Sequence, residues 1–257
     1  MRVKLLSFLL FNVLVSTFSS YAQESNTSWE KIRLKKNQFE LHNVTGSIVK
    51  FQGSKVLKIE RDLNAIPFDE SRIEETVDEP HYARLLGLED FENGEIEVKV
   101  YSQLQDPKPY SGIAGFIGVY FRIHPEDKAF DGIYLRPKAG SSKDQWVRNH
   151  TVQYIAYPDA KFDMLRKRAP FKYEGAAPVV LNEWITMRIV VNGNQAELFI
   201  NSIKHAIFSV DQLLSTNQKG GVGLYVDIGT VGYFKDLKVI KKPYVPVNTK
   251  GNEVKGI

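Results

Sequence analysis

The sequence predicts an all-β protein, a single domain built as a two-sheet antiparallel β-sandwich. About a dozen short segments alternate apolar and polar residues or are apolar throughout, and turn residues separate them at short intervals. Helical periodicity is nearly absent, and neither an internal repeat nor a linker divides the chain. Two sheets packed face to face would bury the large set of Ile, Val, Leu and Phe side chains.

Five strand segments are predicted in the first part of the domain, at residues 38–44, 46–51, 55–61, 82–88 and 95–101. The last of these alternates most clearly, with Ile96, Val98 and Val100 on one face. Residues 66–80 break the pattern, because they place six acidic residues between two prolines. We expect a long acidic loop with solvated side chains there, and a site for a cation or a basic partner is the alternative.

The middle of the chain holds three neighbouring strand segments, residues 116–123, 131–137 and 150–155. A long irregular connection rich in Lys and Arg follows at residues 158–182. Four more strands are predicted after it, and Asn192-Gly193-Asn194 is a hairpin turn between the first two. These last strands cover residues 184–191, 195–201, 221–227 and 233–240.

The N-terminus has the pattern of a signal peptide. Arg2 and Lys4 precede a nearly continuous apolar run over residues 5–18, and small residues end at Ala22, where we expect cleavage. An uncleaved anchor helix is the alternative. No later segment is long and apolar enough to span a membrane, so we expect a secreted or periplasmic protein. The expected organisation is a signal peptide at 1–22, a flexible lead-in at 23–37, the sandwich domain at 38–240 and a polar tail at 241–257.

Charge and cysteine content exclude several classes of protein. Removing residues 1–22 takes two of the 34 basic residues and none of the 30 acidic ones, which leaves a formal charge of +2. This balance gives no reason to expect nucleic acid as a partner. The chain has no cysteine, so disulfides and a lipid-modified N-terminal cysteine are both excluded.

The three central segments indicate a ligand-binding face. Val119, Ile133 and their alternate neighbours form one apolar face, so the other face carries two Tyr-x-Arg pairs and a glutamine from the next strand. Aromatic rings pack on the C–H faces of sugars, and guanidinium and amide groups bond to sugar hydroxyls. A stacked Tyr–Arg ladder that only stabilises the sheet is the alternative. The residues of this face are Tyr120, Arg122, Tyr134, Arg136 and Gln153.

Other polar and aromatic residues are candidates for the same site. Asp227 and Tyr225 share one face of a late strand, and Arg84 has a similar position on an earlier one. Asp227, Asp131 and His150 are the candidate groups for proton transfer. Trp146 lies in a connecting loop, where an exposed aromatic ring suits stacking on a sugar, although a tryptophan that caps the core is equally consistent.

The chain resembles the concanavalin A-like jelly rolls, the superfamily of legume lectins, laminin G-like domains and many glucanases. The resemblance is carried by residues 182–201, 220–226 and 232–239, and by Phe91-Glu-Asn-Gly-Glu-Ile-Glu-Val98. It covers about residues 38–240 and implies a curved sandwich that binds ligands on its concave sheet. Fold alone does not fix function, because this fold carries many activities.

Within that superfamily the chain is most similar to the secreted bacterial 3-keto-disaccharide hydrolases. It shares their order of signal peptide, "FxNGxIE" strand, aromatic-Arg strand and final "WxxxRIVVxGxxxxxxIN" segment. It departs from them at Gly112-Ile-Ala-Gly115, where those sequences have Asn-Ser-Gly, and at Tyr134 and Arg136, where they have Glu-x-Gln.

The sequence therefore predicts a carbohydrate-active protein that binds a saccharide on its concave sheet. As an enzyme it would be a glycoside-cleaving hydrolase or lyase; the alternatives are a lectin-like module without catalysis and a laminin G-like module for protein interaction. No metal-ligand spacing and no phosphate loop occur, so we expect no cofactor. The resemblance allows a structural Ca²⁺ that no motif locates, and the oligomeric state is left open.

Overall fold

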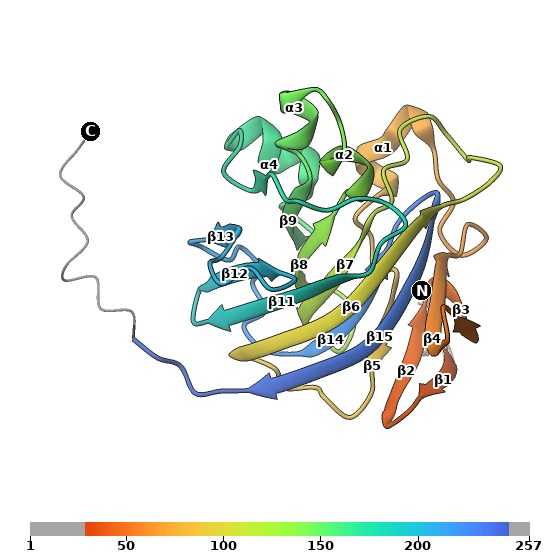
Figure 1. Ribbon diagram of the computed structural model, residues 1–257. Helices are drawn as coiled ribbons and strands as arrows, with labels where there is room; N and C mark the ends of the chain where they lie inside the picture. Colours follow the sequence, from red (N-terminus) through yellow and green to blue (C-terminus); the bar gives the residue numbers. More distant parts are fainter. Residues whose placement is uncertain (1–28, 247–257) are drawn as a thin grey trace, which may run out of the picture.

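The computed structural model describes residues 29–246, which form two antiparallel sheets stacked as a sandwich (Figure 1). The two-sheet antiparallel sandwich predicted from the sequence is therefore confirmed. In spatial order, the eight-stranded sheet contains β1 (Glu30–Leu34), β2 (Asn37–His42), β5 (Tyr82–Leu85), β14 (Gly221–Val226), β7 (Ile117–Ile123), β8 (Phe130–Leu135), β9 (Val152–Tyr157) and β10 (Glu174–Gly175). The seven-stranded sheet contains β13 (Phe208–Val210), β12 (Gln195–Ile200), β11 (Ile185–Asn192), β6 (Gly94–Leu104), β15 (Thr230–Lys241), β4 (Ser54–Arg61) and β3 (Val44–Phe51).

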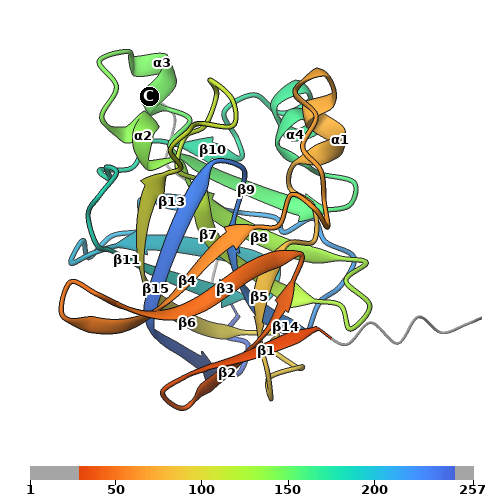
Figure 2. The same ribbon diagram turned by 90° about the vertical axis from the view of Figure 1, so that its right-hand side faces the viewer.

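The helices are short and gather at one end of the sandwich, at the top of both ribbon views (Figure 2). They are η1 (Glu70–Arg72), α1 (Ile73–Thr76), α2 (Pro137–Gly140), α3 (Gln145–Arg148) and α4 (Phe162–Arg168). None of the described helices is long and apolar enough to cross a membrane.

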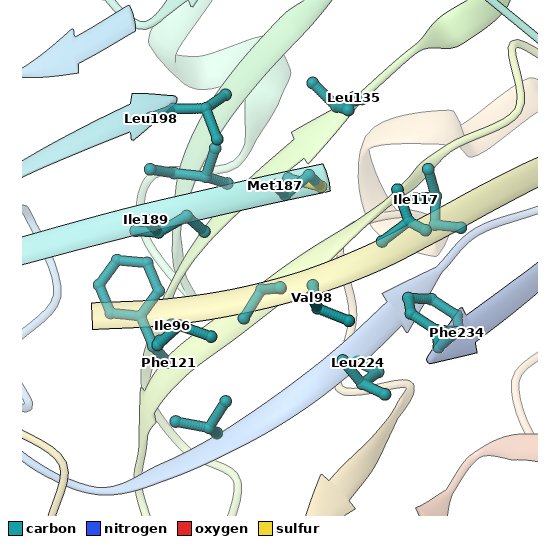
Figure 3. Close-up of a cluster of buried hydrophobic side chains, with 14 of the residues drawn as sticks. Ile96, Val98, Ile117, Phe121, Leu135, Met187, Ile189, Leu198, Leu224 and Phe234 are labelled. Atoms are coloured by element: carbon teal, nitrogen blue, oxygen red, sulfur yellow. The ribbon is translucent and has the colours of Figure 1, made fainter. Parts of the chain in front are cut away.

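The main hydrophobic core lies between the two sheets. Ile96 and Val98 of β6 are buried, and their strand alternates buried with half-exposed residues as the sequence predicts. Figure 3 shows these side chains beside Met187 of β11 and close to Phe121 and Leu224 of the opposite sheet. Each fully buried side chain of this size contributes about 1.5–3 kcal/mol to the stability of the fold.

A second buried layer covers the opposite face of the eight-stranded sheet. Tyr82, Tyr120, Phe130, Tyr134 and Tyr225 form an aromatic cluster in which no residue is more than 2% exposed. Three partly buried aromatic residues pack against this cluster: Phe116 just before β7, Tyr157 at the end of β9 and Phe162 at the start of α4. Most of this outer face, the one expected from the sequence to be the concave ligand face, is therefore covered by packed side chains and does not form an open groove.

The structure differs from the sequence-based expectations in three segments. Residues 30–34, expected in a flexible lead-in, form β1 and pair with β2. The connection at 158–182, expected to be irregular, contains α4 and β10. Residues 66–80, expected to be a solvated loop, contain η1 and α1 and are mostly exposed or half-buried, but Val77 and Asp78 are buried, and Asp78 is only 1% exposed. The predicted signal peptide and most of the predicted tail lie outside the described residues, so both stay predictions.

Candidate functional site

A repeated Gly-x-Tyr pattern on three adjacent strands builds the floor of the site. It occurs at residues 118–120 of β7, 132–134 of β8 and 223–225 of β14. The register places Tyr120 opposite both Gly132 and Gly223, and it places Gly118 opposite Tyr134 and Tyr225. Each tyrosine therefore has a glycine as its neighbour on the next strand.

The glycines let the tyrosine rings lie close to the sheet. A Cβ atom on Gly132 would be 2.6 Å from the ring of Tyr120, and one on Gly118 would be 2.5 Å from Tyr134 Cβ. Real side chains do not pack this closely, so glycine is required at both positions. The rings then contact one another: Tyr120 stacks on Tyr225 at 4.4 Å between centroids, and Tyr134 is 5.2 Å from Tyr225.

A cavity of about 250 Å³ opens at the edge of this aromatic layer, at the end of the sandwich where α1 and α4 lie. Two carboxylates and two arginines line it together with aromatic and aliphatic walls. The lining residues are Ile73, Val77, Asp78, Tyr110, Gly112, Ala114, Phe116, Tyr134, Arg136, Phe162, Arg166 and Asp227. We call this cavity the concave-face pocket.

Two aspartates in the concave-face pocket are joined through one tyrosine hydroxyl. The Tyr225 hydroxyl donates to Asp227 Oδ2 at 2.8 Å and lies 3.4 Å from Asp78 Oδ1. Asp227 Oδ1 accepts from the Arg61 guanidinium at 2.7 Å, and the Ile228 backbone N–H also donates to it at 2.6 Å. Asp78 Oδ2 accepts the backbone N–H of Phe162, at the start of α4, at 3.0 Å.

The surroundings of the two carboxyl groups push their pKa values in opposite directions. Burial, together with the charge of Asp227, raises the pKa of Asp78 to about 6, against the opposing hydrogen bond from the Phe162 N–H. Burial also opposes the ionised form of Asp227, but His81 and Arg61 outweigh it and hold the pKa of Asp227 well below its usual range. Near neutral pH Asp227 is therefore ionised, whereas Asp78 exchanges its proton close to pH 6.

His81 supports Asp227 from behind the pocket. Its side chain is fully buried, its ring lies 5.2 Å from the ring of Tyr225, and its Nε2 is 3.3 Å from Asp227 Oδ1. The contact is close enough for charge attraction, but its direction leaves both ring nitrogens without an aligned hydrogen bond among the described residues. This contact and the Arg61 ion pair together hold the pKa of Asp227 down.

Arg136 forms the opposite side of the pocket and is held by four acceptors. Its guanidinium donates to the His150 carbonyl at 2.9 Å, to Gln153 Oε1 at 3.0 Å, to Glu174 Oε1 at 3.2 Å and to the Tyr134 hydroxyl at 3.3 Å. A guanidinium fixed in this way keeps a defined orientation towards a ligand.

Arg166 of α4 joins the same network. It forms a two-point ion pair with Glu174, whose carboxylate it therefore shares with Arg136. Both guanidinium groups flank the ring of Phe162, at 5.9 Å for Arg136 and 5.4 Å for Arg166. The carboxyl groups around the pocket are thus those of Asp78, Asp227 and Glu174. The three guanidinium groups near them are those of Arg61, Arg136 and Arg166.

The structure brings together six of the residues that the sequence singled out. Tyr134, Arg136 and Asp227 line the concave-face pocket directly. Gln153 binds Arg136, and Tyr225 binds Asp227. Tyr120 stacks beneath them, and its buried hydroxyl has no hydrogen-bond partner among residues 29–246.

Asp131 does not line the pocket, because alternation along β8 turns it to the opposite face. It shares that face with Ile133 of the main core, and it accepts the Tyr154 hydroxyl at 2.6 Å and the Ser215 N–H at 3.3 Å. Burial raises the pKa of Asp131 to about 6.

Arg122 also lies away from the concave face. Its φ of 54° marks an irregularity near the end of β7, next to the register shift against β14, and Ile123 takes the place in the aromatic layer instead. The Arg122 guanidinium donates to the carbonyls of Glu92 and Gly193 at 2.6–3.0 Å and so ties the two sheets together.

The remaining three candidates lie beside or far from the pocket. His150 is buried near Glu174, with 3.5 Å between Nε2 and the carboxylate. Trp146 of α3 is 56% exposed and packs on His150 at 4.1 Å between ring centroids. Arg84 belongs to a separate network with Glu89 and Asp127, and it does not line the pocket.

Sequence reasoning missed several residues of the site. Asp78 was grouped with the exposed acids of its loop, although it directly follows the buried Val77. Arg61 and His81 carry no motif, because they reach Asp227 only through tertiary packing. The repeated Gly-x-Tyr on three strands was the available signal, since glycine opposite tyrosine predicts rings that lie on a sheet. Other missed residues are Tyr110, Phe116, Phe162, Arg166 and Glu174.

No protein-family model matches the sequence, and no curated protein matches it either. The resemblance to the 3-keto-disaccharide hydrolases therefore stays a prediction. Similar solved structures exist, and they have concanavalin A-like jelly-roll folds. They include the carbohydrate-binding module CBM66 of Bacillus subtilis, which is 9% identical, with 77% of this chain and 94% of that chain covered and a TM-score of 0.44.

Two further solved structures are similar to this chain over most of its length. The Bacillus licheniformis β-glucanase is 13% identical, with 86% of this chain and 95% of that chain covered and a TM-score of 0.41. The exoplasmic/lumenal domain of VIP36, bound to Ca²⁺ and Man3GlcNAc, is 10% identical, with 88% of each chain covered and a TM-score of 0.41. At these values the likeness carries no argument on function, which rests on the residues of this chain.

Proposed function

We propose that this protein binds a saccharide in the concave-face pocket and cleaves a glycosidic bond there by acid–base catalysis. Asp78 is the proposed donor of the proton to the leaving oxygen, and the ionised Asp227 is the proposed base that takes a proton from the water that adds to the sugar carbon. The observation that carries the proposal is this pair of carboxyl groups, which both lie at the Tyr225 hydroxyl. Burial raises the pKa of Asp78, whereas Arg61 and His81 lower the pKa of Asp227. Such pairs supply the acid and the base of glycoside cleavage.

The walls of the pocket suit a sugar. Phe116, Phe162 and Tyr110 offer apolar surface for C–H groups, and Tyr134 and Arg136 offer polar atoms to hydroxyl groups. The guanidinium groups of Arg61, Arg136 and Arg166 are already paired with the carboxylates of Asp227 and Glu174, so none of them is left free to pair with the charge of an anionic sugar. An uncharged sugar is therefore the proposed substrate class.

The size of the pocket limits how the sugar binds. Its volume of about 250 Å³ is below the roughly 300–1,000 Å³ of common ligand sites. The neighbouring concave face is closed by buried rings such as Tyr82 and Phe130. The proposed ligand is therefore one terminal sugar residue, or a short saccharide, rather than a polymer lying along the sheet.

A lectin-like function without catalysis is the second candidate, and one observation favours it. The carboxylate oxygens of Asp227 already contact the Arg61 guanidinium, the Ile228 N–H and the Tyr225 hydroxyl. Asp227 as a whole is only 3% exposed. A carboxylate held by this many donors has little free capacity to attack a sugar or to activate water. In that case the buried charges would orient Tyr134 and Arg136 for binding alone.

The two candidates are separated by incubating the purified chain with a panel of neutral and uronic-acid-containing mono-, di- and polysaccharides. Thermal shift reports binding, and release of reducing ends reports cleavage. Product from a neutral saccharide supports the enzyme, and a thermal shift without product supports the lectin-like module. Neither signal with any saccharide would refute both and favour a protein-interaction module.

The matched variants are Tyr134→Phe, which removes a hydroxyl from the pocket, and Tyr157→Phe, which removes one outside it. We expect the first to weaken the saccharide signal and the second to leave it unchanged. Equal effects would place the ligand elsewhere. We also propose export from the cytoplasm, which N-terminal sequencing of the mature protein would test.

A further inference from the structure

The Tyr225 hydroxyl connects the two carboxyl groups that exchange protons in the proposed reaction. It donates to Asp227 Oδ2 at 2.8 Å and lies 3.4 Å from Asp78 Oδ1. Among residues 29–246, no other side chain forms hydrogen bonds with both carboxyl groups. A hydroxyl has one proton and two lone pairs, so it can accept a proton from one neighbour while it gives its own to the other.

The proposed cleavage leaves both carboxyl groups in the wrong protonation state for the next cycle. Asp78 gives its proton to the leaving oxygen and becomes ionised. Asp227 takes one proton from the attacking water and becomes neutral, while the hydroxyl group of that water stays on the sugar carbon. One proton must therefore move from Asp227 to Asp78 before a second sugar can be cleaved.

Solvent has little access to either carboxyl group. Asp78 and Asp227 are buried, and Tyr225 between them is fully buried. Other rings enclose Tyr225: Tyr120 stacks on it at 4.4 Å between centroids, and Tyr134 lies 5.2 Å away. A proton that travelled from Asp227 to Asp78 through bulk water would have to pass this packing or the sugar in the pocket. The route through the Tyr225 hydroxyl is direct.

One oxygen of Asp227 is left for this transfer. Oδ1 accepts from the Arg61 guanidinium at 2.7 Å and from the Ile228 N–H at 2.6 Å. Oδ2 instead faces the Tyr225 hydroxyl and the backbone N–H of Asp78, which lies 3.4 Å away. A proton that Asp227 takes up is therefore placed on Oδ2, next to the oxygen of Tyr225.

The surroundings make the return of the proton favourable. Against the effect of burial, His81 and Arg61 hold the pKa of Asp227 well below its usual range, whereas burial raises the pKa of Asp78 to about 6. Asp227 therefore holds a proton more weakly than Asp78 does. Burial and the charge of Asp227 also raise the pKa of Tyr225 well above its usual value. The hydroxyl must therefore take up one proton as it gives away the other, because it does not ionise on its own.

Two cations face Asp78 from other elements. Arg136 follows β8 and Lys161 precedes α4, and both favour the ionised form of Asp78. Each is already paired, Arg136 with Glu174 and Lys161 with Glu79. They lower the pKa of Asp78 by less than burial raises it, so Asp78 stays the more basic carboxyl group of the pair.

We propose that Tyr225 returns the proton of each cycle from Asp227 to Asp78, a transfer that we call the Tyr225 relay. The proton on Asp227 Oδ2 passes to the Tyr225 oxygen while the Tyr225 proton passes to Asp78 Oδ1, so two O–H bonds form as two break. The site returns to its state before cleavage without exchanging a proton with solvent. Tyr225 does not line the pocket, so it is a positioning residue that acts through the two aspartates. The Tyr225 relay rests on the glycoside cleavage proposed above.

The test follows product formation by rapid quenching, with a saccharide that the wild type cleaves. Tyr225→Phe keeps the ring in its stack and removes only the hydroxyl. Its first turnover should occur at close to the wild-type rate, and a burst of product should mark it. Later turnovers should be slower by about tenfold or more, which corresponds to about 1.4 kcal/mol in the barrier. A small proton carrier such as imidazole should accelerate these later turnovers in the variant and leave the wild type unchanged.

Tyr154→Phe is the matched control, because it also removes a buried tyrosine hydroxyl from an aspartate, here Asp131 on the opposite face of the sheet. It should show neither the burst nor the response to imidazole, whatever its effect on stability. The Tyr225 relay is overturned if Tyr225→Phe slows the first and the later turnovers equally, or slows neither. In both cases the proposed cleavage stands, because the wild type still forms product.

A second measurement decides the Tyr225 relay without turnover. The ¹³C signals of the Asp78 and Asp227 carboxyl groups are followed by NMR as the pH rises through about 6. In the wild type the Asp227 signal should move together with that of Asp78, because an ionised Asp78 draws the Tyr225 proton away from Asp227. This joint response should be largely lost in Tyr225→Phe and kept in Tyr154→Phe. An unchanged response in Tyr225→Phe overturns the relay, whereas a wild type that cleaves no saccharide overturns the proposed cleavage.

Discussion

At the scale of single residues, Asp78 has the clearest consequence for stability, because its folded-state pKa is raised. Burial and the charge of Asp227 raise this pKa well above the usual range of an aspartate, to about 6. The protonated carboxyl therefore stabilises the fold fully below pH 4, and this contribution is lost as the pH rises through 6. The loss amounts to about 3 kcal/mol of unfolding free energy.

Asp78→Asn should therefore stabilise the protein at pH 8 and have little effect at pH 4, because the amide stays neutral at both. Urea unfolding at the two pH values measures the difference. The exposed Glu75→Gln, on the same loop, is the matched control and should change neither value. Equal stability of wild type and Asp78→Asn at pH 8 would show that Asp78 ionises without cost.

A second prediction at this scale concerns Arg61, whose substitution should lower the unfolding free energy instead of raising it. It forms an ion pair with Asp227, and the two side chains are only 1% and 3% exposed. Removing one partner leaves a buried charge without compensation, so Arg61→Met should cost about 3–5 kcal/mol of unfolding free energy. Lys55→Met, at an exposed position of the same strand, should be nearly neutral. A cost below about 1 kcal/mol for Arg61→Met would contradict the buried pair.

At the scale of elements, the Gly-x-Tyr strands carry the site. Gly132→Ala would place a Cβ atom 2.6 Å from the Tyr120 ring, which is fully buried and has no space to move. We expect a loss of about 1–3 kcal/mol in unfolding free energy, measured by urea titration. The same substitution in a Tyr120→Leu background should cost much less. Equal costs in both backgrounds would show that the two residues do not compete for space.

The elements also show how far sequence alone reaches. Strict alternation located Ile96 and Val98 in the core, and it placed Tyr134, Arg136 and Gln153 on one face. The same rule predicted the wrong face for Arg122. The positive φ of Arg122 itself, near the end of β7, turns its side chain to the other face of the sheet. Sequence could not identify Arg61, His81 or Asp78, because distant segments meet at Asp227 only in the folded sandwich.

At the scale of the whole molecule, the sandwich confines the proposed saccharide site to one end. The helices gather at that end (Figures 1 and 2), and α4 contributes Phe162 and Arg166 to the concave-face pocket. A ligand that binds the folded chain and not the unfolded one stabilises the fold.

A saccharide bound in the concave-face pocket should therefore raise the unfolding free energy by about 2.7 kcal/mol at 100 times its Kd. Urea unfolding with and without the saccharide measures this increase. No increase at a saturating concentration would contradict binding to the folded protein.

The most direct test of the central claim compares Asp78→Asn with wild type on a saccharide that wild type binds and cleaves. If Asp78 donates the proton, the variant should bind the saccharide with nearly unchanged affinity and lose product formation by a factor of about 10²–10⁴. It should do so while being more stable than wild type at pH 8. Product formation at the wild-type rate by Asp78→Asn would contradict the proposal.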